Sequence, residues 1–129
     1  MIQPALAAGT WVLCDRFVDS TRVYQGLAGG IGVERVDRLH ELLLPPLRPD
    51  LTLLLDLDPE LGLRRRGLDG PEGRFESKGP AFHLLVRDGF RRLAAGEPGR
   101  FALVDARGTP AEVAEAVWTA VSGRLSVGR

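Results

Sequence analysis

The sequence predicts an α/β fold in which a parallel sheet is covered by helices. Three short segments, residues 11–14, 51–57 and 101–104, are mainly apolar and do not alternate between apolar and polar residues. Such continuous runs are typical of strands buried on both faces of a parallel sheet, whereas half-exposed strands alternate. Segments with helical periodicity separate the three runs, and strands that alternate with helices form right-handed crossovers in a parallel sheet. We therefore expect a sheet with helices on both faces.

Two helices are predicted in the first part of the chain. Residues 1–8 suit the last turns of a helix, and Gly9 is a residue type that commonly follows a helix end. Residues 33–44 place most of their apolar side chains along one face of a second helix. This helix should stop where it does because Pro45 and Pro46 follow it.

Three helices are predicted in the second part. Residues 59–66 begin with a proline, which favours the first position of a helix. A longer helix is indicated by apolar residues at helical spacing and closes at Gly96; they are Phe82, Leu85, Val86, Phe90 and Leu93. Thr109 suits the N-cap of the last helix and Pro110 its first position. Residues 67–73 contain three glycines and a proline, which predicts an exposed loop.

Composition excludes several classes of function. The chain has 129 residues, enough for one modest domain, and a formal net charge of zero. The zero net charge therefore gives no reason to expect binding to nucleic acid or to an anionic membrane. No apolar run approaches the roughly 20 residues that are needed to span a bilayer. Cys14 is the only cysteine, and His40 and His83 lack ligand-like spacing, so neither a disulfide nor a protein-held metal site is expected. A cytoplasmic location is the default expectation.

The most informative segment spans residues 15–26 and follows the first predicted strand. Its polar side chains should lie at the carboxyl edge of the sheet, where open α/β folds bind ligands. Asp15 and Arg16 alone would favour a salt bridge at the end of a strand. Four hydrogen-bonding residues follow them at near-helical spacing: Ser20, Thr21, Tyr24 and Gln25. Because arginine grips a phosphate with two hydrogen bonds, and hydroxyl and amide groups bind bases and sugars, the segment predicts a site for a phosphorylated, planar ligand.

The same residues carry a resemblance to a known family. The Asp-Arg-aromatic triplet, the Ser-Thr pair and the Tyr-Gln-Gly of residues 15–26 are similar to the thymidylate kinase signature. Further matches follow in the same order at residues 48–52, 55–57, 59–60, 64–66, 74–76, 82–90 and 104–106. The resemblance extends from about Ile2 to Arg124. It implies a P-loop-kinase-like parallel sheet covered by helices, incomplete here, with three of about five strands present.

The resemblance also implies an activity. Thymidylate kinases transfer the γ-phosphate of ATP, with Mg²⁺, to dTMP and so make dTDP for DNA precursor synthesis. In this chain Arg16 would hold the acceptor phosphate, and Asp15 would belong to the polar network around the phosphates and Mg²⁺. Ser20, Thr21 and Gln25 would approach the base. Tyr24 would pack beside the deoxyribose and disfavour a 2′-hydroxyl group.

Two further segments would bind ATP by the same resemblance. Residues from about 64 to 76 correspond to the lid that closes over ATP, with Arg65 and Arg74 at catalytic positions. Gly67 and Asp69 stand where the family often has further arginines. Three successive helical residues point in different directions, so Arg64, Arg65 and Arg66 cannot all reach one phosphate, and a solvated helix end explains each of them equally well. Residues 105–109 form the adenine-side loop, with Asp105, Ala106 and Arg107 beside the base.

The sequence lacks one part that phosphoryl transfer from ATP needs. A Walker A loop ends in Gly-Lys-Ser or Gly-Lys-Thr, and its backbone amides and lysine hold the phosphates. Lys78 is the only lysine, and Ser77 and Gly79 flank it in the wrong order. We therefore expect a truncated kinase that is inactive alone.

Other interpretations stay open. They are a non-catalytic module that binds a nucleotide or a subunit, and a fragment of a related nucleoside or nucleotide kinase. The sequence Tyr24-Gln25 after Ser20-Thr21 favours thymidylate. The expected small-molecule partners are dTMP and ATP, and both a homodimer and a complementing N-terminal chain are considered.

Overall fold

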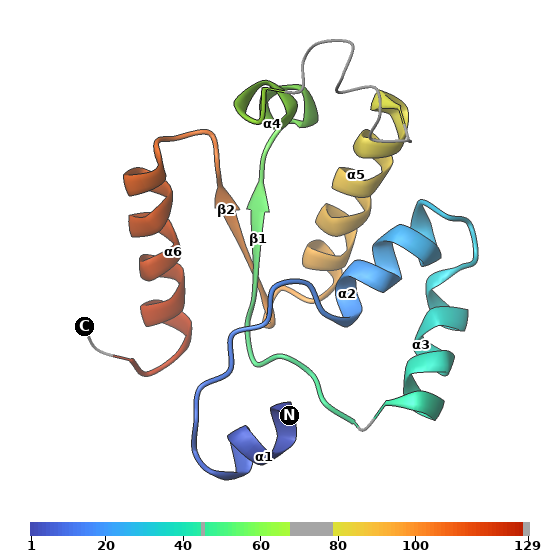
Figure 1. Cartoon of the computed structure of the whole chain (residues 1–129), viewed down its shortest axis with the longest axis vertical. Coiled ribbons are helices and arrows are strands. Elements are labelled where there is room, and N and C mark those ends of the chain that lie inside the picture. Colours follow the sequence, from blue (N-terminus) through green and yellow to red (C-terminus); the bar gives the residue numbers. More distant parts are fainter. Residues whose placement is uncertain (45, 68–78, 128–129) are drawn as a thin grey trace. The chain divides into compact units, whose positions relative to one another are not determined.

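The computed structural model describes residues 1–44, 46–67 and 79–127. They cluster into two compact units, Met1–Arg48 and Pro49–Arg129, and each unit is described by itself. Figure 1 follows the chain from α1 to α6 in sequence order. The first unit is helical, and the second contains a parallel sheet with helices.

The first unit contains four helices: α1 (Ile2–Ala7), α2 (Val18–Thr21), the π-helix η1 (Arg22–Leu27) and α3 (Val33–Leu43). Gly9, two residues beyond α1, has a φ of 74°, the left-handed conformation that glycine adopts after a helix. Leu44 is extended, with φ −116° and ψ 145°, as expected for a residue that precedes a proline. The predicted helices over residues 1–8 and 33–44 are therefore confirmed within a residue at their ends.

The core of the first unit lies between η1 and α3. Val23 is 0% exposed and Val36 is 3% exposed. Gly26 allows the close approach of the two helices, because a Cβ there would lie 3.2 Å from the Cα of Val33. A side chain at this position would push α3 away from η1.

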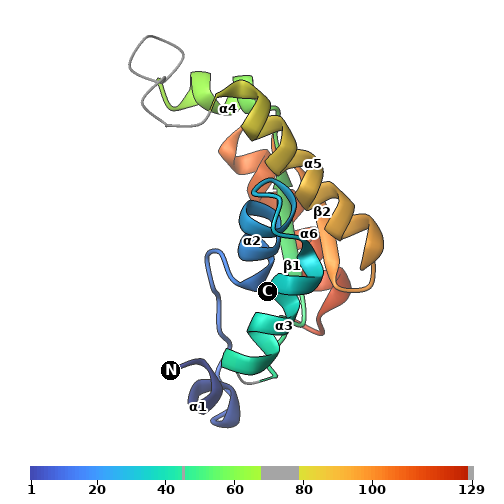
Figure 2. The same cartoon turned by 90° about the vertical axis from the view of Figure 1, so that its right-hand side faces the viewer.

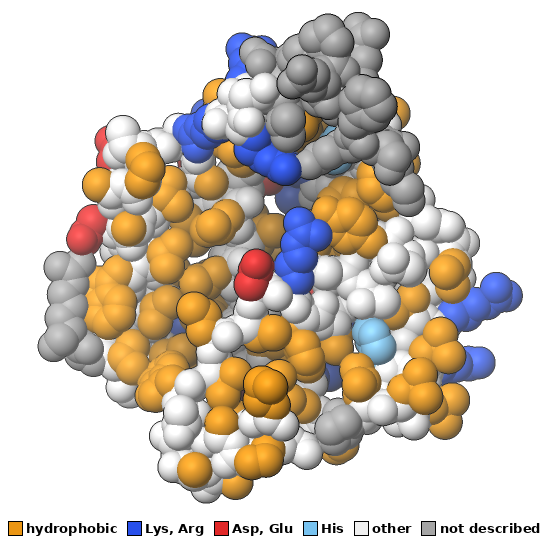
Figure 3. All heavy atoms as spheres, in the orientation of Figure 1, with side chains coloured by type: hydrophobic (Ala, Val, Ile, Leu, Met, Phe, Trp, Pro, Cys, Tyr) orange, Lys and Arg blue, Asp and Glu red, His pale blue; other side chains and the backbone are white. Residues whose placement is uncertain are grey.

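The predicted strand over residues 11–14 is wrong. These residues form no regular structure, and Trp11 and Leu13 are 67% and 97% exposed. Hydrophobic side chains lie on the surface around α1 and over α6 (Figure 3). A strand exists only through its ladder of hydrogen bonds to a neighbouring strand, and the sheet of the described residues contains β1 and β2 alone. An apolar run indicates what could be buried, but it does not supply the partner.

The second unit is built on two parallel strands, β1 (Thr52–Asp56) and β2 (Phe101–Asp105). Their register places Thr52 opposite Phe101 and Asp56 opposite Asp105. The predicted strands in these two regions are thus confirmed, with β2 one residue longer than expected. The connection runs through α4 (Pro59–Arg65) and α5 (Pro80–Gly96), and α6 (Pro110–Arg124) follows β2.

Helices α5 and α6 cover the two strands. Helix α5 packs on both strands and α6 packs on β2, and the two helices stand on either side of the strands in Figure 1. Figure 2 shows α5 running along the strand pair. The core contains mainly side chains from β2 and α5, including Phe101, Val104, Val86 and Leu93. The described residues of this unit therefore form an α/β fold with a two-stranded parallel sheet.

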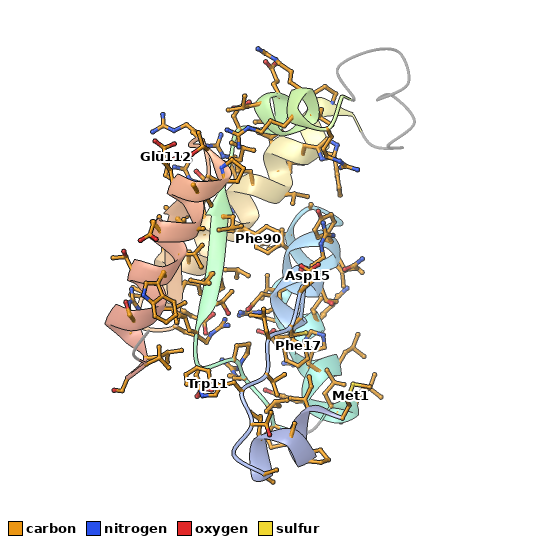
Figure 4. The ribbon with its side chains drawn as sticks, turned by 60° about the vertical axis from the view of Figure 1, so that its left-hand side comes forward. Met1, Trp11, Asp15, Phe17, Phe90 and Glu112 are labelled. Atoms are coloured by element: carbon orange, nitrogen blue, oxygen red, sulfur yellow. The ribbon has the colours of Figure 1, made fainter. Side chains whose placement is uncertain are left out.

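Helix α6 begins with a capping box. The hydroxyl of Thr109 accepts a hydrogen bond from the backbone N–H of Glu112 at 3.3 Å, and the Glu112 carboxylate accepts one from the Thr109 N–H at 2.7 Å. Glu112 lies in the first turn of the helix (Figure 4). These two hydrogen bonds satisfy amide groups that the helix itself leaves without partners.

We predict that Thr109→Ala lowers the free energy of unfolding by about 1 kcal/mol, because the N-cap oxygen is lost. Thr119→Ala is the matched control, since Thr119 lies inside α6 and its hydroxyl donates only to the Glu115 carbonyl of the same helix. Urea unfolding of the purified variants measures both values. Equal destabilisation by the two changes would contradict the capping role.

Candidate functional site

Arg16 has an unusual backbone conformation. Its φ is 59°, the only positive value at a non-glycine residue in the part of the chain that is described. The left-handed conformation costs an ordinary residue about 1–2 kcal/mol, and such strain is concentrated at functional sites. The Arg16 guanidinium carbon lies 5.6 Å from the centre of the Tyr24 ring, within the range of a cation–π contact. Arg16 thus contacts Tyr24 while its backbone adopts a conformation that is unfavourable for arginine.

The other predicted residues of this segment share two adjoining helical turns. Ser20 and Thr21 belong to α2, and Tyr24 and Gln25 belong to η1. Asp15 and Phe17 lie on the segment that leads into α2 (Figure 4). We call Arg16, Ser20, Thr21, Tyr24 and Gln25 the acceptor cluster. Sequence spacing did not predict the π-helix, a rare conformation that is frequent at functional sites.

An ion-pair network that the sequence analysis missed links α2 and η1 to α3. The Asp19 side chain is buried, and its Oδ1 lies 3.3 Å from Nη1 of Arg22. The Arg22 Nε also lies 2.9 Å from Oδ1 of Asp37, on α3. A buried carboxylate without a partner is strongly destabilising, so Arg22 stabilises the turn that carries Ser20 and Thr21. The spacing of three residues from Asp19 to Arg22 could have revealed one pair, whereas Asp37 is distant in sequence.

A second group of predicted residues comes together in the other unit. The Arg65 guanidinium, at the end of α4, donates hydrogen bonds to the carbonyl oxygens of Ala106, at 2.7 Å, Arg107, and Gly108, at 3.2 Å. The loop after β2 is therefore tied to α4, although the two were predicted from separate motifs. Arg64 points elsewhere and pairs with Glu60 at 3.4 Å on the solvent side. Arg74 lies outside the described residues.

Asp105 and Arg107 form a local ion pair in this loop. Nη2 of Arg107 lies 2.6 Å from Oδ2 of Asp105, and the Arg107 backbone N–H donates to Oδ1 at 3.0 Å. The hydrogen bonds from the Arg107 side chain, followed by the one from its backbone, lower the pKa of Asp105 to about 2. Both side chains are exposed, so the pair orders the loop more than it stabilises the fold.

Arg87 joins the carboxyl end of β1 to the start of α4. Its Nε and Nη2 donate to the two oxygens of Asp56, at 2.9 and 3.0 Å, and its Nη1 donates to Asp58 at 3.2 Å. The hydrogen bonds from Arg87 lower the pKa of Asp56. Arg87 belongs to the matched segment of residues 82–90, but the sequence analysis gave it no role, because its partners lie in distant segments.

No group of three or more histidine, cysteine, aspartate or glutamate residues is placed to hold a metal ion in the described ranges. Among the described helices, none is both long and apolar enough to cross a membrane.

The chain is similar to known proteins. A family model described as thymidylate kinase matches residues 1–117. The thymidylate kinase of Rhodopseudomonas palustris strain TIE-1 is 48% identical over 129 residues, which cover 97% of this chain and 56% of that protein. That of Trichlorobacter lovleyi is 49% identical over 133 residues, with 98% and 63% covered.

A solved structure is also similar. The crystal structure of thymidylate kinase from Ehrlichia chaffeensis superposes with a TM-score of 0.69 at 26% sequence identity. The match covers 97% of this chain and 57% of that one. The chain thus spans between about half and two thirds of the length of the proteins that it matches.

We predict that the carboxyl group of Asp105 titrates with a midpoint of about 2 and that Arg107→Gln moves the midpoint up toward 3.8. Because the folded pKa is the lower one, the stabilisation by this pair is present above pH 3.8 and is lost as the pH falls through about 2. A carbon-detected NMR titration at low ionic strength measures both midpoints. Arg64→Gln is the control, and an unchanged midpoint in Arg107→Gln would exclude the pairing.

We predict that Arg16→Gly is more stable than Arg16→Ala by about 0.5–1 kcal/mol. The left-handed penalty of about 1–2 kcal/mol exceeds the additional unfolded-state entropy of glycine, about 0.4–1 kcal/mol. The matched pair Arg38→Gly and Arg38→Ala, inside α3, should show the opposite order by about 1 kcal/mol. Urea unfolding measures the free energy of unfolding of all four variants. If alanine is more stable than glycine at position 16, as it is expected to be at position 38, the backbone of Arg16 is not strained.

Proposed function

The chain belongs to the thymidylate kinase family, and we propose that it supplies the acceptor-nucleotide site of an enzyme that transfers the γ-phosphate of ATP to dTMP. The observation that carries this proposal is Arg16, held in a left-handed conformation against Tyr24 within the acceptor cluster. Backbone strain at a charged residue that contacts an aromatic ring, close in sequence to further hydrogen-bonding residues, is typical of a preorganised binding site.

The acceptor cluster offers groups that match each part of dTMP. The Arg16 guanidinium binds the phosphate with two parallel hydrogen bonds, a geometry that a lysine cannot provide. The amide of Gln25 and the hydroxyls of Ser20 and Thr21 can each donate and accept, as the carbonyl and N–H groups on the edge of thymine require. The Tyr24 ring packs against the deoxyribose and leaves little room for a 2′-hydroxyl. Asp15 joins the polar network around the phosphates.

The donor nucleotide would contact the other unit. We infer that the loop Asp105–Arg107 lies beside adenine and that Arg65 shapes this loop by binding its carbonyl oxygens. Arg65 and Arg74 are the two lid arginines that the family resemblance assigns to catalysis. On this proposal residues 1–129 are one partial domain that carries the acceptor motif at residues 15–26, the lid at about 64–76 and the adenine-side loop at 105–109.

The residues of this chain fit ATP and Mg²⁺ only in part. When bound, Mg²⁺ and a phosphate-binding loop neutralise the charge that spreads over the transferred phosphoryl group. The 129 residues contain no Gly-Lys-Ser or Gly-Lys-Thr sequence, so the principal phosphate-binding loop must come from other sequence. The limited share of each relative that the chain covers supports the same interpretation. The catalytic unit would then be a longer chain or a complex, working in the cytoplasm in dTDP synthesis.

A non-catalytic module that binds dTMP is the second candidate. The absence of a Walker A sequence favours it, because the acceptor cluster needs no such loop to bind a nucleotide. Activity with an added phosphate-binding loop distinguishes the two candidates.

We predict that the purified chain binds dTMP more tightly than its ribonucleotide analogue and transfers no phosphate from ATP. Adding an N-terminal thymidylate kinase segment that carries Gly-x-x-Gly-x-Gly-Lys-Ser/Thr should restore transfer. Arg16→Ala should then reduce kcat/KM by about 10- to 150-fold, because a charge-assisted hydrogen bond contributes about 1.5–3 kcal/mol.

Arg38→Ala, on the exposed side of α3, is the matched control and should change the rate little. Calorimetry measures binding and a coupled assay measures transfer. Binding of dTMP without transfer in the complemented protein would favour the non-catalytic module. Equal effects of Arg16→Ala and Arg38→Ala would remove Arg16 from the site.

A further inference from the structure

Arg87 bridges two carboxylates from different elements. It lies in the middle of α5, and its guanidinium donates two hydrogen bonds to Asp56, at the end of β1, and one to Asp58, before α4. Asp56 is largely buried, with 14% of its side chain exposed, and a quarter of the Arg87 side chain is exposed. One side chain therefore fixes three elements: the end of β1, the start of α4 and the middle of α5.

Asp58 also caps α4, so its hydrogen bond with Arg87 affects the position of this helix. Its Oδ1 accepts a hydrogen bond from the backbone N–H of Glu60 at 2.9 Å and so caps α4, while its Oδ2 accepts from Arg87. The N-cap of α4 is thus anchored to α5. Helix α4 has only seven residues, so the placement of its first turn determines where its last turn lies.

The other end of α4 is anchored as well. Arg65 binds the carbonyl oxygens of residues 106–108, and the N–H of Ala106 donates to the backbone carbonyl of Asp56 at 3.0 Å. The contacts close a ring: Arg87 holds Asp56 and Asp58, α4 carries Arg65, and Arg65 holds the loop that is bonded back to Asp56. A change at Arg87 should therefore affect the loop in two ways, through Asp58, α4 and Arg65, and through Asp56.

We propose that Arg87 is a positioning residue that sets the placement of α4 and, through Arg65, the conformation of the loop at residues 106–108. Because that loop is the proposed adenine-side loop, the consequence for nucleotide binding rests on the proposed function. Arg87 itself acts through Asp56 and Asp58 and needs no contact with a nucleotide.

Charge alone does not give Arg87 this role. Arg91, one turn further along α5, also lies near Asp56, but its Nε is 3.8 Å away, beyond hydrogen-bond distance. A lysine at position 87 would keep the charge but could not present a planar fork to two carboxylates. The three changes Arg87→Gln, Arg87→Lys and Arg91→Gln therefore separate charge from geometry.

The test uses the full chain and amide hydrogen exchange followed by NMR. The Ala106 N–H reports on the loop, the guanidinium signals of Arg65 report on its carbonyl contacts, and the Val117 amide in α6 reports on global unfolding. Arg87→Gln should speed exchange at Ala106 by about tenfold relative to Val117, the loss expected for one charge-assisted hydrogen bond. Arg87→Lys should give an intermediate increase, and Arg91→Gln less than about twofold.

A role in general stability alone would raise exchange at Ala106 and Val117 equally, and that result would overturn the proposal. So would equal effects of Arg87→Gln and Arg91→Gln. If Arg87→Gln fails to fold, the comparison of Arg87→Lys with Arg91→Gln decides by the same criterion.

ADP with Mg²⁺ is added as a separate probe. Protection of residues 106–108 by ADP in the unmodified chain, weakened in Arg87→Lys, would extend the positioning role to nucleotide binding. Lack of protection in the unmodified chain would count against the proposed adenine-side loop, while the exchange data without ADP still decide the role of Arg87.

Discussion

The parallel pairing of β1 with β2 is the constraint on which the second unit depends. Its register places Asp56 and Asp105 opposite each other, at the carboxyl ends of adjacent strands. Two carboxylates at neighbouring positions repel each other unless each is compensated. Arg87 pairs with Asp56 and Arg107 pairs with Asp105, so each of the two carboxylates has an arginine partner. These ion pairs help to fix the loop after β2 and the start of α4. Arg65 connects α4 with that loop.

The local features of the fold could be predicted from sequence because the information for them is local. Thr109 and Glu112 form a cap within one helical turn, and Pro59 begins α4 because proline suits that position. The continuous apolar runs identified β1 and β2 correctly. The run at residues 11–14 has the same pattern but no strand beside it within the described sheet, so pairing and not hydrophobicity decided the outcome.

The contacts within the candidate site could not be predicted from the sequence. Sequence spacing proposed the acceptor cluster, and the structure adds the left-handed backbone of Arg16 and the π-helix, neither of which has a local sequence signal. Arg22 and Arg87 were missed because each one binds a carboxylate that is 15 or more residues away. Their role depends on which helices pack together, and a hydrophobic pattern specifies that only coarsely.

The preference of this chain for arginine over lysine has a structural consequence. Lys78 is the only lysine, and composition alone did not distinguish a genomic bias from a chemical need. Arg22 lies between two carboxylates, Arg87 binds two carboxylates, and Arg65 binds three carbonyl oxygens. Each contact set uses donors that point in several fixed directions from one planar group, whereas an ammonium group acts as a compact point charge. At these three positions the geometry of the guanidinium, more than its charge, joins segments that are distant in sequence.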